Sequence, residues 1–425
     1  MKHAEVLERV YDPGRLRAAW QQVKQNAGAA GIDQMTVGEF EARQEELLEI
    51  IGEKLRARTY RFKPARRALI AKEGTTSEKR KLGIPVVMDR VVGQSIHRVF
   101  EEIFDPGFTR ANFGFRRGKS PHQAIRYVQG LVREGYQWCA SIDLARFFDE
   151  IPHGLILRLI RRKIADERVV TLIARALKAG VMVDGKFERT DQGCPQGSPL
   201  SPILSNIVLN EFDHELERRG LKYGRWADDF VIVLRSERAA RRVMAGCIRY
   251  LEAGLGLRVN REKSQVANIK DVTFLGFQIL RGKIRVSNKA REKFKARVRD
   301  LTRRNNPLST YEVTLKLNTY LRGWVGYFRI QEFRYLFRDL DGWIRSRMRS
   351  VQLKKWKKPR KFQRVMMKAG FAPQQARRVW IKMNRRQSVD RKEVRFVLNL
   401  QWFRQLGLFC LHEFTMATPG PRSGR

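Results

Sequence analysis

Two adjacent acidic residues interrupt an apolar stretch in the middle of this chain, and they restrict its fold more than any other feature. The sequence "YGRWADDFVIVL" places Asp228 and Asp229 between an aromatic residue and a run of strand-forming residues. This pattern predicts two short strands joined by a turn that carries both carboxylates. An isolated buried carboxylate is costly to ionise, and carboxylates brought together raise each other's pKa. The pair therefore belongs either to an ordinary polar turn or to a site that binds cations.

A third acid strengthens the cation hypothesis. In "SIDLARFFDEIP", Asp143 follows a strand-like stretch and precedes a helical one. Mg²⁺ favours a few carboxylate oxygens together with substrate phosphate oxygens. Two such ions, roughly 4 Å apart, can activate a 3′-hydroxyl and stabilise a leaving pyrophosphate. An aspartate at a turn or a helix cap is the structural alternative for each residue taken singly.

The charge of the chain indicates a polyanionic partner. Its 425 residues include 86 Lys and Arg against 44 Asp and Glu, a formal net charge of +42. Such a field attracts nucleic acid or an anionic membrane surface. The chain has no run of about 18 apolar residues and no signal peptide pattern, so a soluble protein that faces nucleic acid is the expectation.

The strand and helix patterns change along the chain. Up to about residue 290, short strand-like stretches, including a basic hairpin after residue 60, alternate with helical ones. Beyond this point the pattern is helical, aromatic and basic, and residues 281–425 hold 38 Lys and Arg against 9 Asp and Glu. We therefore predict an α+β catalytic core followed by an α-helical, nucleic-acid-facing domain.

Several motifs, in their order along the chain, resemble those of one family. "RWADDFVIVL" is similar to the aspartate hairpin of reverse transcriptases, and "SIDLARFFDEIPH" to their first palm motif. Three further stretches are similar to other motifs of that family: "QGCPQGSPLSPILSNIVLNEFD", "GLRVNREKSQV" and "VTFLGFQI". Within the family the chain resembles the group II intron-encoded reverse transcriptase/maturase, on these motifs: "GIDQMTVGEF", "KRKLGIPVVMDRVV", "FGFRRGKSPHQAI" and "LNTYLRGWVGYF".

The resemblance implies a right-hand polymerase architecture. Fingers and palm, built of antiparallel sheet and helices, would be followed by an α-helical thumb, the maturase domain. We expect an N-terminal extension and the start of the fingers in residues 1–65, fingers and palm in 66–290, the thumb in 291–380, and a short basic DNA-binding-like segment in 381–425. The chain lacks the paired cysteines of the zinc-binding endonuclease that many relatives carry, and so resembles the compact branch without it.

The resemblance also implies a catalytic centre. Asp143, Asp228 and Asp229 match the catalytic aspartates. Asp143, Asp228 and the backbone carbonyl of Leu144 would be the metal ligands, and Asp229 would support them. Two Mg²⁺ ions are expected there, with Mn²⁺ as a substitute.

A deoxynucleoside triphosphate pocket is implied beside the aspartates. Phe148 would exclude a 2′-hydroxyl, Gln196 would contact the nucleotide, and Lys79, Arg80 and Lys263 would contact its phosphates. Lys81 lies in the same basic stretch, and the spacing does not decide which of its residues makes the contact. The structural alternatives are a core aromatic residue, a turn loop and solvated surface charges.

Nucleic-acid contacts are implied at nine further positions. Trp226 replaces the Tyr or Phe usual in the family, which leaves the geometry of the primer end open. The nine residues are Arg116, Arg117, Lys119, Trp226, Gly276, Lys354, Lys355, Lys357 and Lys358.

The predicted function is therefore an RNA-directed DNA polymerase that also assists the splicing and mobility of its intron. Its partners would be the group II intron RNA, an RNA template, a DNA primer, target DNA and dNTPs, with no membrane and no obligatory protein partner. Two alternatives remain: a splicing factor that chiefly binds RNA, and an intron-independent relative in DNA repair or phage defence.

Overall fold

The computed structural model describes residues 2–71, 79–333, 335–356, 358–381 and 389–417. The chain divides into two compact units, Met1–Leu275 and Gly276–Arg425. The division precedes the boundary expected at residue 290, because a β-hairpin at residues 277–286 packs with the second unit. Within the described residues, no helix is both long and apolar enough to span a membrane.

The first unit begins with helices around a shared apolar core. An Asp12 side chain accepts from the Arg15 amide and starts one helix, and Thr36 and Glu39 form a capping box at the start of another. Trp20 and Phe40, both buried, pack with ring centroids 4.4 Å apart. The helices are α1 (Val6–Tyr11), α2 (Pro13–Asn26), α3 (Val37–Ala42), α4 (Gln44–Arg56) and α5 (Val87–Phe104).

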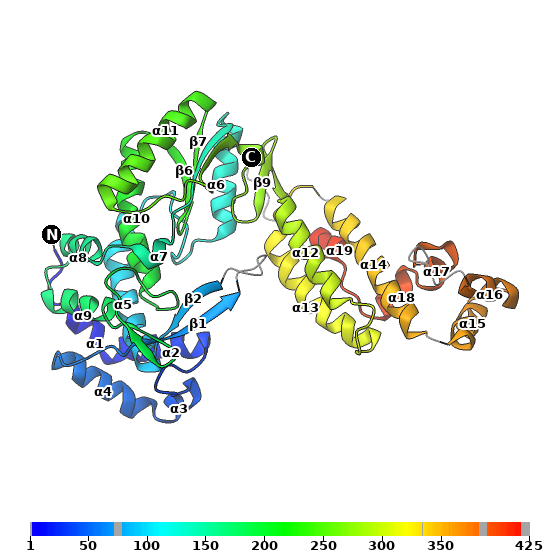
Figure 1. Ribbon diagram of the computed structural model, residues 1–425, viewed down its shortest axis with the longest axis horizontal. Coiled ribbons are helices and arrows are strands. Elements are labelled where there is room, and N and C mark those ends of the chain that lie inside the picture. Colours follow the sequence, from blue (N-terminus) through cyan, green and yellow to red (C-terminus); the bar gives the residue numbers. More distant parts are fainter. Residues whose placement is uncertain (1, 72–78, 334, 357, 382–388, 418–425) are drawn as a thin grey trace. The chain divides into compact units, whose positions relative to one another are not determined.

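The predicted basic hairpin is confirmed, and it belongs to a small sheet. Strands β1 (Ala65–Ala71) and β2 (Lys79–Ile84) pair antiparallel, while β1 pairs parallel with β4 (Val181–Val183), which pairs with β5 (Lys186–Glu188). The order of this sheet is β2-β1-β4-β5. Figure 1 shows the hairpin as two antiparallel arrows.

A second sheet carries the predicted aspartates. Its order is β6-β7-β3-β8, with every neighbouring pair antiparallel. β7 is buried from Phe230 to Leu234, which explains its unbroken apolar sequence. The strands are β3 (Trp138–Ile142), β6 (Lys222–Trp226), β7 (Asp229–Leu234) and β8 (Gln265–Asn268).

Helices cover this sheet and complete the first unit. The helices α6 (Pro121–Arg133), α10 (Ser201–Arg218) and α11 (Glu237–Arg249) pack against its strands. The remaining helical segments are α7 (Phe147–Glu150), α8 (His153–Lys163), α9 (Glu167–Leu177), η1 (Asp105–Gly107), η2 (Tyr250–Gly254) and η3 (Ile269–Asp271). Of these segments, α8 and α9 pack on each other and η1 packs on α5.

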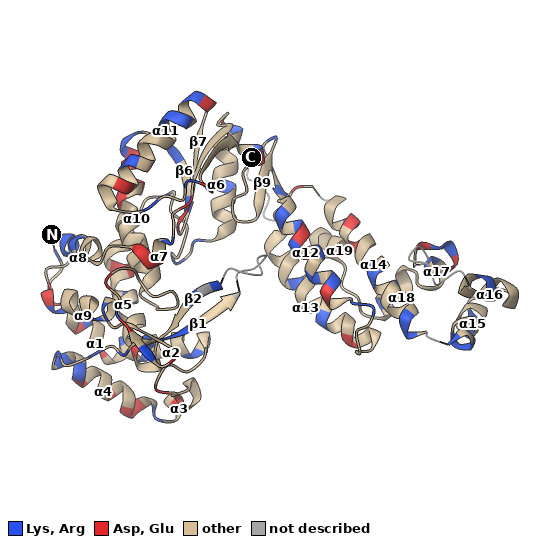
Figure 2. Ribbon diagram, viewed as in Figure 1, with Lys and Arg blue, Asp and Glu red and all other residues tan. Residues whose placement is uncertain are grey.

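The second unit is mainly helical, as predicted. Its hairpin β9 (Phe277–Leu280) and β10 (Lys283–Val286) packs through Phe277 on Phe328, with ring centroids 5.0 Å apart. Figure 2 shows Lys and Arg recurring along its helices. These are α12 (Asn288–Leu301), α13 (Thr310–Phe328), α14 (Tyr335–Lys355), α15 (Pro359–Lys368), α16 (Pro373–Ile381), α17 (Lys392–Val397), α18 (Leu400–Gln405) and α19 (Leu411–Ala417).

Candidate active site

The first unit contains a cavity of about 960 Å³ that both sheets help to line. Its walls come from the β1–β2 hairpin, the end of β3, the loop before α10, the β6–β7 turn and the segment after η2. Its residues are Arg67, Lys79, Lys81, Gly83, Asp143, Leu144, Ala145, Arg146, Phe148, Asp149, Glu150, Val181, Thr190, Gln192, Gly193, Cys194, Pro195, Gln196, Asp228, Arg258, Asn260 and Lys263. The volume suits a ligand of nucleotide size.

Asp143 is held at the end of β3 by its backbone. Its amide donates to the Ser264 hydroxyl at 3.0 Å, and its carbonyl accepts from the Asn260 amide at 2.8 Å. The side chain is 40% exposed, and Lys263 Nζ lies 4.0 Å from its Oδ2. The main-chain bonds therefore fix Asp143 while its carboxylate stays available to the cavity.

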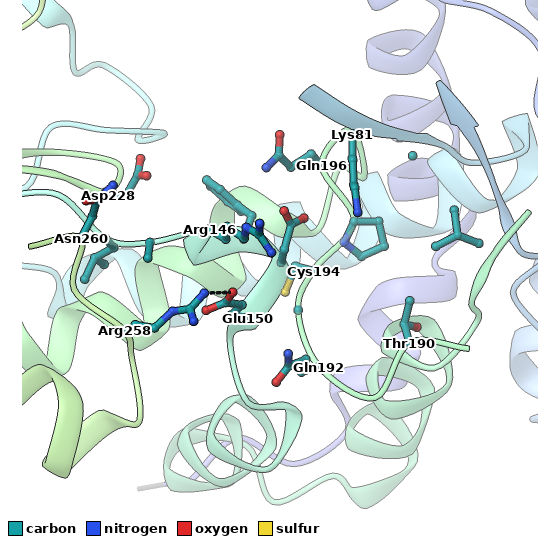
Figure 3. A pocket seen from close by; sticks show the side chains of 18 of the residues that line it. Lys81, Arg146, Glu150, Thr190, Gln192, Cys194, Gln196, Asp228, Arg258 and Asn260 are labelled. Carbon is teal, nitrogen blue, oxygen red and sulfur yellow. Dashed lines mark hydrogen bonds and ion pairs between the residues drawn. The ribbon is translucent and has the colours of Figure 1, made fainter. Parts of the chain in front are cut away.

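Asp228 enters the same cavity from the two-residue turn between β6 and β7. Ala227, the other turn residue, has a left-handed backbone with φ of 56°. Figure 3 shows the Asp228 side chain beside Asn260 at one side of the cavity. Two carboxylates that are 85 residues apart in the sequence thus share one cavity wall region.

Asp229 plays a different structural part. It is the first residue of β7, pairs with Trp226 across the ladder, and does not line the cavity. Burial, followed by the nearby charges of Asp228 and Asp143, raises its pKa to about 7. The three acids therefore act on one another electrostatically, as carboxylates of one site would.

The donor set fits a hard divalent cation that keeps substrate oxygens in its shell. Among the described residues, no three His, Cys, Asp or Glu side chains are grouped closely enough to hold a metal by themselves. Mg²⁺ commonly binds through one or two carboxylates plus phosphate oxygens, and Asp143 and Asp228 supply such a pair. Leu144, whose side chain is buried, brings its backbone to the same wall.

Basic side chains surround the acids. Lys79 and Lys263, which the sequence indicated, line the cavity, whereas the Arg80 side chain lies outside the described part of the structure. The backbone of Arg80 pairs with Ile70 in the hairpin.

Sequence reasoning missed three further arginines, at positions 67, 146 and 258. Arg67 and Leu69 lie on the same face of β1, and Leu69 pairs with Lys81 across the hairpin. The register of the hairpin could therefore have indicated that Arg67 and Lys81 share a face. Arg146 has a left-handed backbone, and Arg258 donates to Glu150 at 2.6 Å (Figure 3). These two depend on long-range packing and leave no local sequence signal.

Phe148 lies half-buried in the cavity wall. Its ring meets Phe147 edge-on at 5.3 Å and Phe115 at 6.4 Å, measured between centroids. The ring is thus packed on two sides and presents the rest of its surface to the cavity.

Gln196 lies on a loop that is attached to strand β2. Its carbonyl accepts from the Gly83 amide of β2 at 2.7 Å. Gly197 has φ of +108°, and a Cβ there would lie 2.5 Å from the Gly83 carbonyl oxygen. Only glycine allows this close approach.

Two histidines hold the ends of this loop, and the sequence analysis did not single them out. His153 Nε2 lies 2.8 Å from the Gly193 carbonyl oxygen, and His97 Nδ1 lies 2.9 Å from that of Pro199. Burial lowers the pKa of both rings. Neutral imidazoles therefore fix the loop from α5 and α8.

The expectation for Arg116 needs revision. All its N–H groups serve the protein itself: the side chain pairs with Asp105 at 2.6 Å and donates to the carbonyls of Thr109 and Asn112. Arg117 and Lys119 are exposed, and the Lys119 ammonium lies 5.7 Å from the Phe113 ring centroid. Arg116 is therefore a packing residue, whereas its two neighbours face solvent.

The remaining residues predicted to contact nucleic acid lie in different environments. Trp226 ends β6 in the first unit, half-buried beside the aspartate turn. In the second unit, Lys354 and Lys358 are exposed, whereas Lys355 Nζ donates to the Asn306 carbonyl at 2.6 Å. Gly276 packs under Phe328, and Lys357 lies outside the described residues.

Comparisons with known proteins match both units. Residues 70–279 match the family model "Reverse transcriptase (RNA-dependent DNA polymerase)", and residues 291–370 match "Group II intron, maturase-specific domain". Protein YkfC of Escherichia coli (strain K12) is 32% identical over 298 residues, which are 61% of this chain and 78% of YkfC. The group II intron-encoded protein LtrA of Lactococcus lactis subsp. cremoris is 34% identical over 229 residues, which are 52% of this chain and 37% of LtrA.

Solved structures give more distant matches. A chain of a partial Cas6-RT-Cas1–Cas2 complex matches with a TM-score of 0.36 and 23% identity, over 59% of this chain and 42% of that one. Apo telomerase from Candida tropicalis matches with a TM-score of 0.42 and 14% identity, over 53% of this chain and 55% of that one.

Proposed function

The chain belongs to the family of group II intron-encoded reverse transcriptases and maturases, and we propose that the cavity at Asp143 and Asp228 is its polymerase active site. One observation carries this proposal: carboxylates from the end of β3 and from the β6–β7 turn line one cavity of nucleotide size, surrounded by Lys and Arg. Carboxylates facing basic residues in one cleft suit a reaction in which a cation and a polyphosphate meet.

Asp143 and Asp228 would hold Mg²⁺, two ions in our proposal and Mn²⁺ as a substitute, with Asp229 as the supporting acid. Bound metal would lower the pKa of a primer 3′-hydroxyl and offset charge on the pyrophosphate that leaves. The protein's own part is to keep the two carboxylates in place. The backbone bonds of Asp143 and the packed turn of Asp228 serve that purpose.

The basic wall would bind the triphosphate of a dNTP. Lys79 and Lys81 come from the hairpin, Arg146 and Arg258 from the palm side, and Lys263 from beside Asp143. Because the cations lie on two walls of the cavity, several of them could contact the triphosphate at once, and no single one would be essential.

The sugar and base would meet Phe148 and Gln196. An aromatic ring packed against Phe147 and Phe115 cannot move aside to admit a 2′-hydroxyl. Selection of dNTPs over ribonucleotides would follow from this rigidity.

The second unit would bind nucleic acid. Its exposed Lys354 and Lys358, with the surrounding Lys and Arg, suit contacts to phosphates of template, primer, target DNA and parent intron RNA. Such a protein would work in a ribonucleoprotein of the bacterial cytoplasm or nucleoid.

Primer extension on an RNA template tests the assignment. We expect Asp228→Ala to abolish extension with RNA affinity retained, and Glu237→Ala, which removes an exposed carboxylate on α11, to leave extension unchanged. Extension by Asp228→Ala at the wild-type rate would contradict the proposal. In a splicing assay, rescue by an Asp228→Ala/Asp229→Ala variant would show that intron binding is a separate activity.

A further inference from the structure

A buried arginine lies directly behind the turn that presents Asp228. Arg225 of β6 and Asp213 of α10 are both fully buried. Arg225 Nε donates to both carboxylate oxygens of Asp213, at 2.9 and 3.0 Å, and Nη2 donates to the same carboxylate. One side of the guanidinium is thereby fixed to α10.

The other side of the guanidinium holds the turn. Nη1 of Arg225 donates to the Ala227 carbonyl at 3.0 Å and to Asn206 Oδ1 at 2.9 Å. Ala227 immediately precedes Asp228 and has φ of 56°, a left-handed conformation that is unfavourable for an L-residue other than glycine. Such a turn persists only where the surrounding contacts impose it.

A neighbouring segment closes around the same turn. The Phe113 amide donates to the Arg225 carbonyl and the Arg225 amide to the Ala111 carbonyl, each at 2.9 Å. Asn206 Nδ2 donates to the Gly114 carbonyl at 2.8 Å. Arg225 thus connects α10, residues 111–114 and the Asp228 turn, with Asn206 as a second link between α10 and Gly114.

We propose that Arg225 is a positioning residue for the polymerase reaction: by binding the Ala227 carbonyl, it fixes the direction in which Asp228 enters the cavity. This inference rests on the proposed polymerase function. The competing explanation is a buried ion pair that serves stability alone, since such pairs are often replaceable by apolar residues without loss of stability. The two explanations differ in their effect on kcat of the folded enzyme.

Three variants separate these explanations. Arg225→Lys keeps the charge beside Asp213, but a single ammonium cannot reproduce the fork that reaches both Asp213 and Ala227. Arg225→Met with Asp213→Leu removes both buried charges together. Arg168→Lys is the matched control, because Arg168 also pairs with a buried aspartate, Asp166, outside the cavity lining.

Single-nucleotide primer extension and thermal unfolding are measured for each variant. We expect Arg225→Lys and the paired variant to lower kcat about ten- to a hundredfold, with KM for the dNTP and primer–template affinity within about twofold of wild type. We expect the Arg168→Lys control to change Tm only. Should the paired variant fail to fold, the Arg225→Lys result decides alone.

A folded Arg225→Lys protein with wild-type kcat, or a loss of kcat that only follows the folded fraction, would overturn the inference. Wild type and Asp228→Ala are assayed alongside. If wild type extends no primer, or Asp228→Ala extends normally, the proposed function fails instead.

Discussion

Replacement of Gly114 by alanine should disable the aspartate turn. A Cβ at this position would lie 2.2 Å from the Ala227 amide nitrogen, 3.0 Å from the Trp226 carbonyl carbon and 3.1 Å from the Ala227 Cα. Ordinary contact begins near 3.5 Å, so the backbone must separate by about 1 Å. The atoms concerned belong to the main chain of the turn, which cannot move aside as a side chain would.

The magnitude follows from that displacement. A shift of about 1 Å in a catalytic group can lower turnover about a hundredfold, and overpacking costs about 1–3 kcal/mol of stability. We therefore expect Gly114→Ala to lower kcat by about two orders of magnitude and to lower Tm by several degrees.

Gly130→Ala provides the matched control for this measurement. Gly130 lies inside α6, where an added Cβ meets nothing within 4 Å. Alanine should therefore raise helix stability by about 0.5–1 kcal/mol with kcat unchanged. The assay is single-nucleotide primer extension together with thermal unfolding of both variants. If Gly114→Ala retained kcat within twofold and an unchanged Tm, the packing argument would be refuted.

Three further predictions concern selectivity, pH and RNA binding. Phe148→Ala should lower the ratio of kcat/KM for dNTPs over ribonucleotides by at least about tenfold, measured by single-nucleotide extension, because the packed ring no longer limits the sugar; an unchanged ratio would exclude Phe148 as the gate. Burial raises the pKa of Asp89, which accepts from the Tyr60 hydroxyl, to about 7. Because the folded pKa of Asp89 is higher than its unfolded pKa, its contribution to stability is complete below about pH 4 and is lost as the pH rises through 7, by up to about 4 kcal/mol. Between pH 4 and pH 8 the Tm should therefore fall more steeply for wild type than for Asp89→Asn. Parallel curves of Tm against pH would contradict this. Lys354→Ala should weaken RNA binding and reduce its salt slope by about 1, whereas Lys355→Ala, whose ammonium holds a backbone carbonyl, should mainly lower Tm; equal effects on RNA affinity would contradict the distinction.

Features set by local chemistry could be predicted from the sequence. The basic hairpin and the hairpin around the two acids both form as expected. The turn of the second hairpin holds Ala227 and Asp228, whereas Asp229 is already the first residue of β7. The approach of Asp143 to Asp228 was predicted through family resemblance, because no local pattern reports which strands become neighbours.

Features set by long-range contacts could not be predicted in this way. Arg116 reads as a surface cation in the sequence, but the loop from Asp105 to Asn112 folds around its guanidinium. Nothing in the local sequence distinguishes His97 and His153 from other helix residues. Their role depends on the loop before α10, whose carbonyl oxygens they contact. Periodicity indicates which face of a helix is buried, but not which distant backbone atom that face meets.

The attachment of β2 to the loop of Gln196 has a consequence for nucleotide entry. Because the Gly83 amide is bonded to the Gln196 carbonyl, any movement of the β1–β2 hairpin would carry the loop of Gln196 with it. Lys79 and Lys81 of the hairpin and the loop of Gln196 would then move together. Admission of a nucleotide would then change the width of the whole cavity, and not only the position of the β1–β2 hairpin.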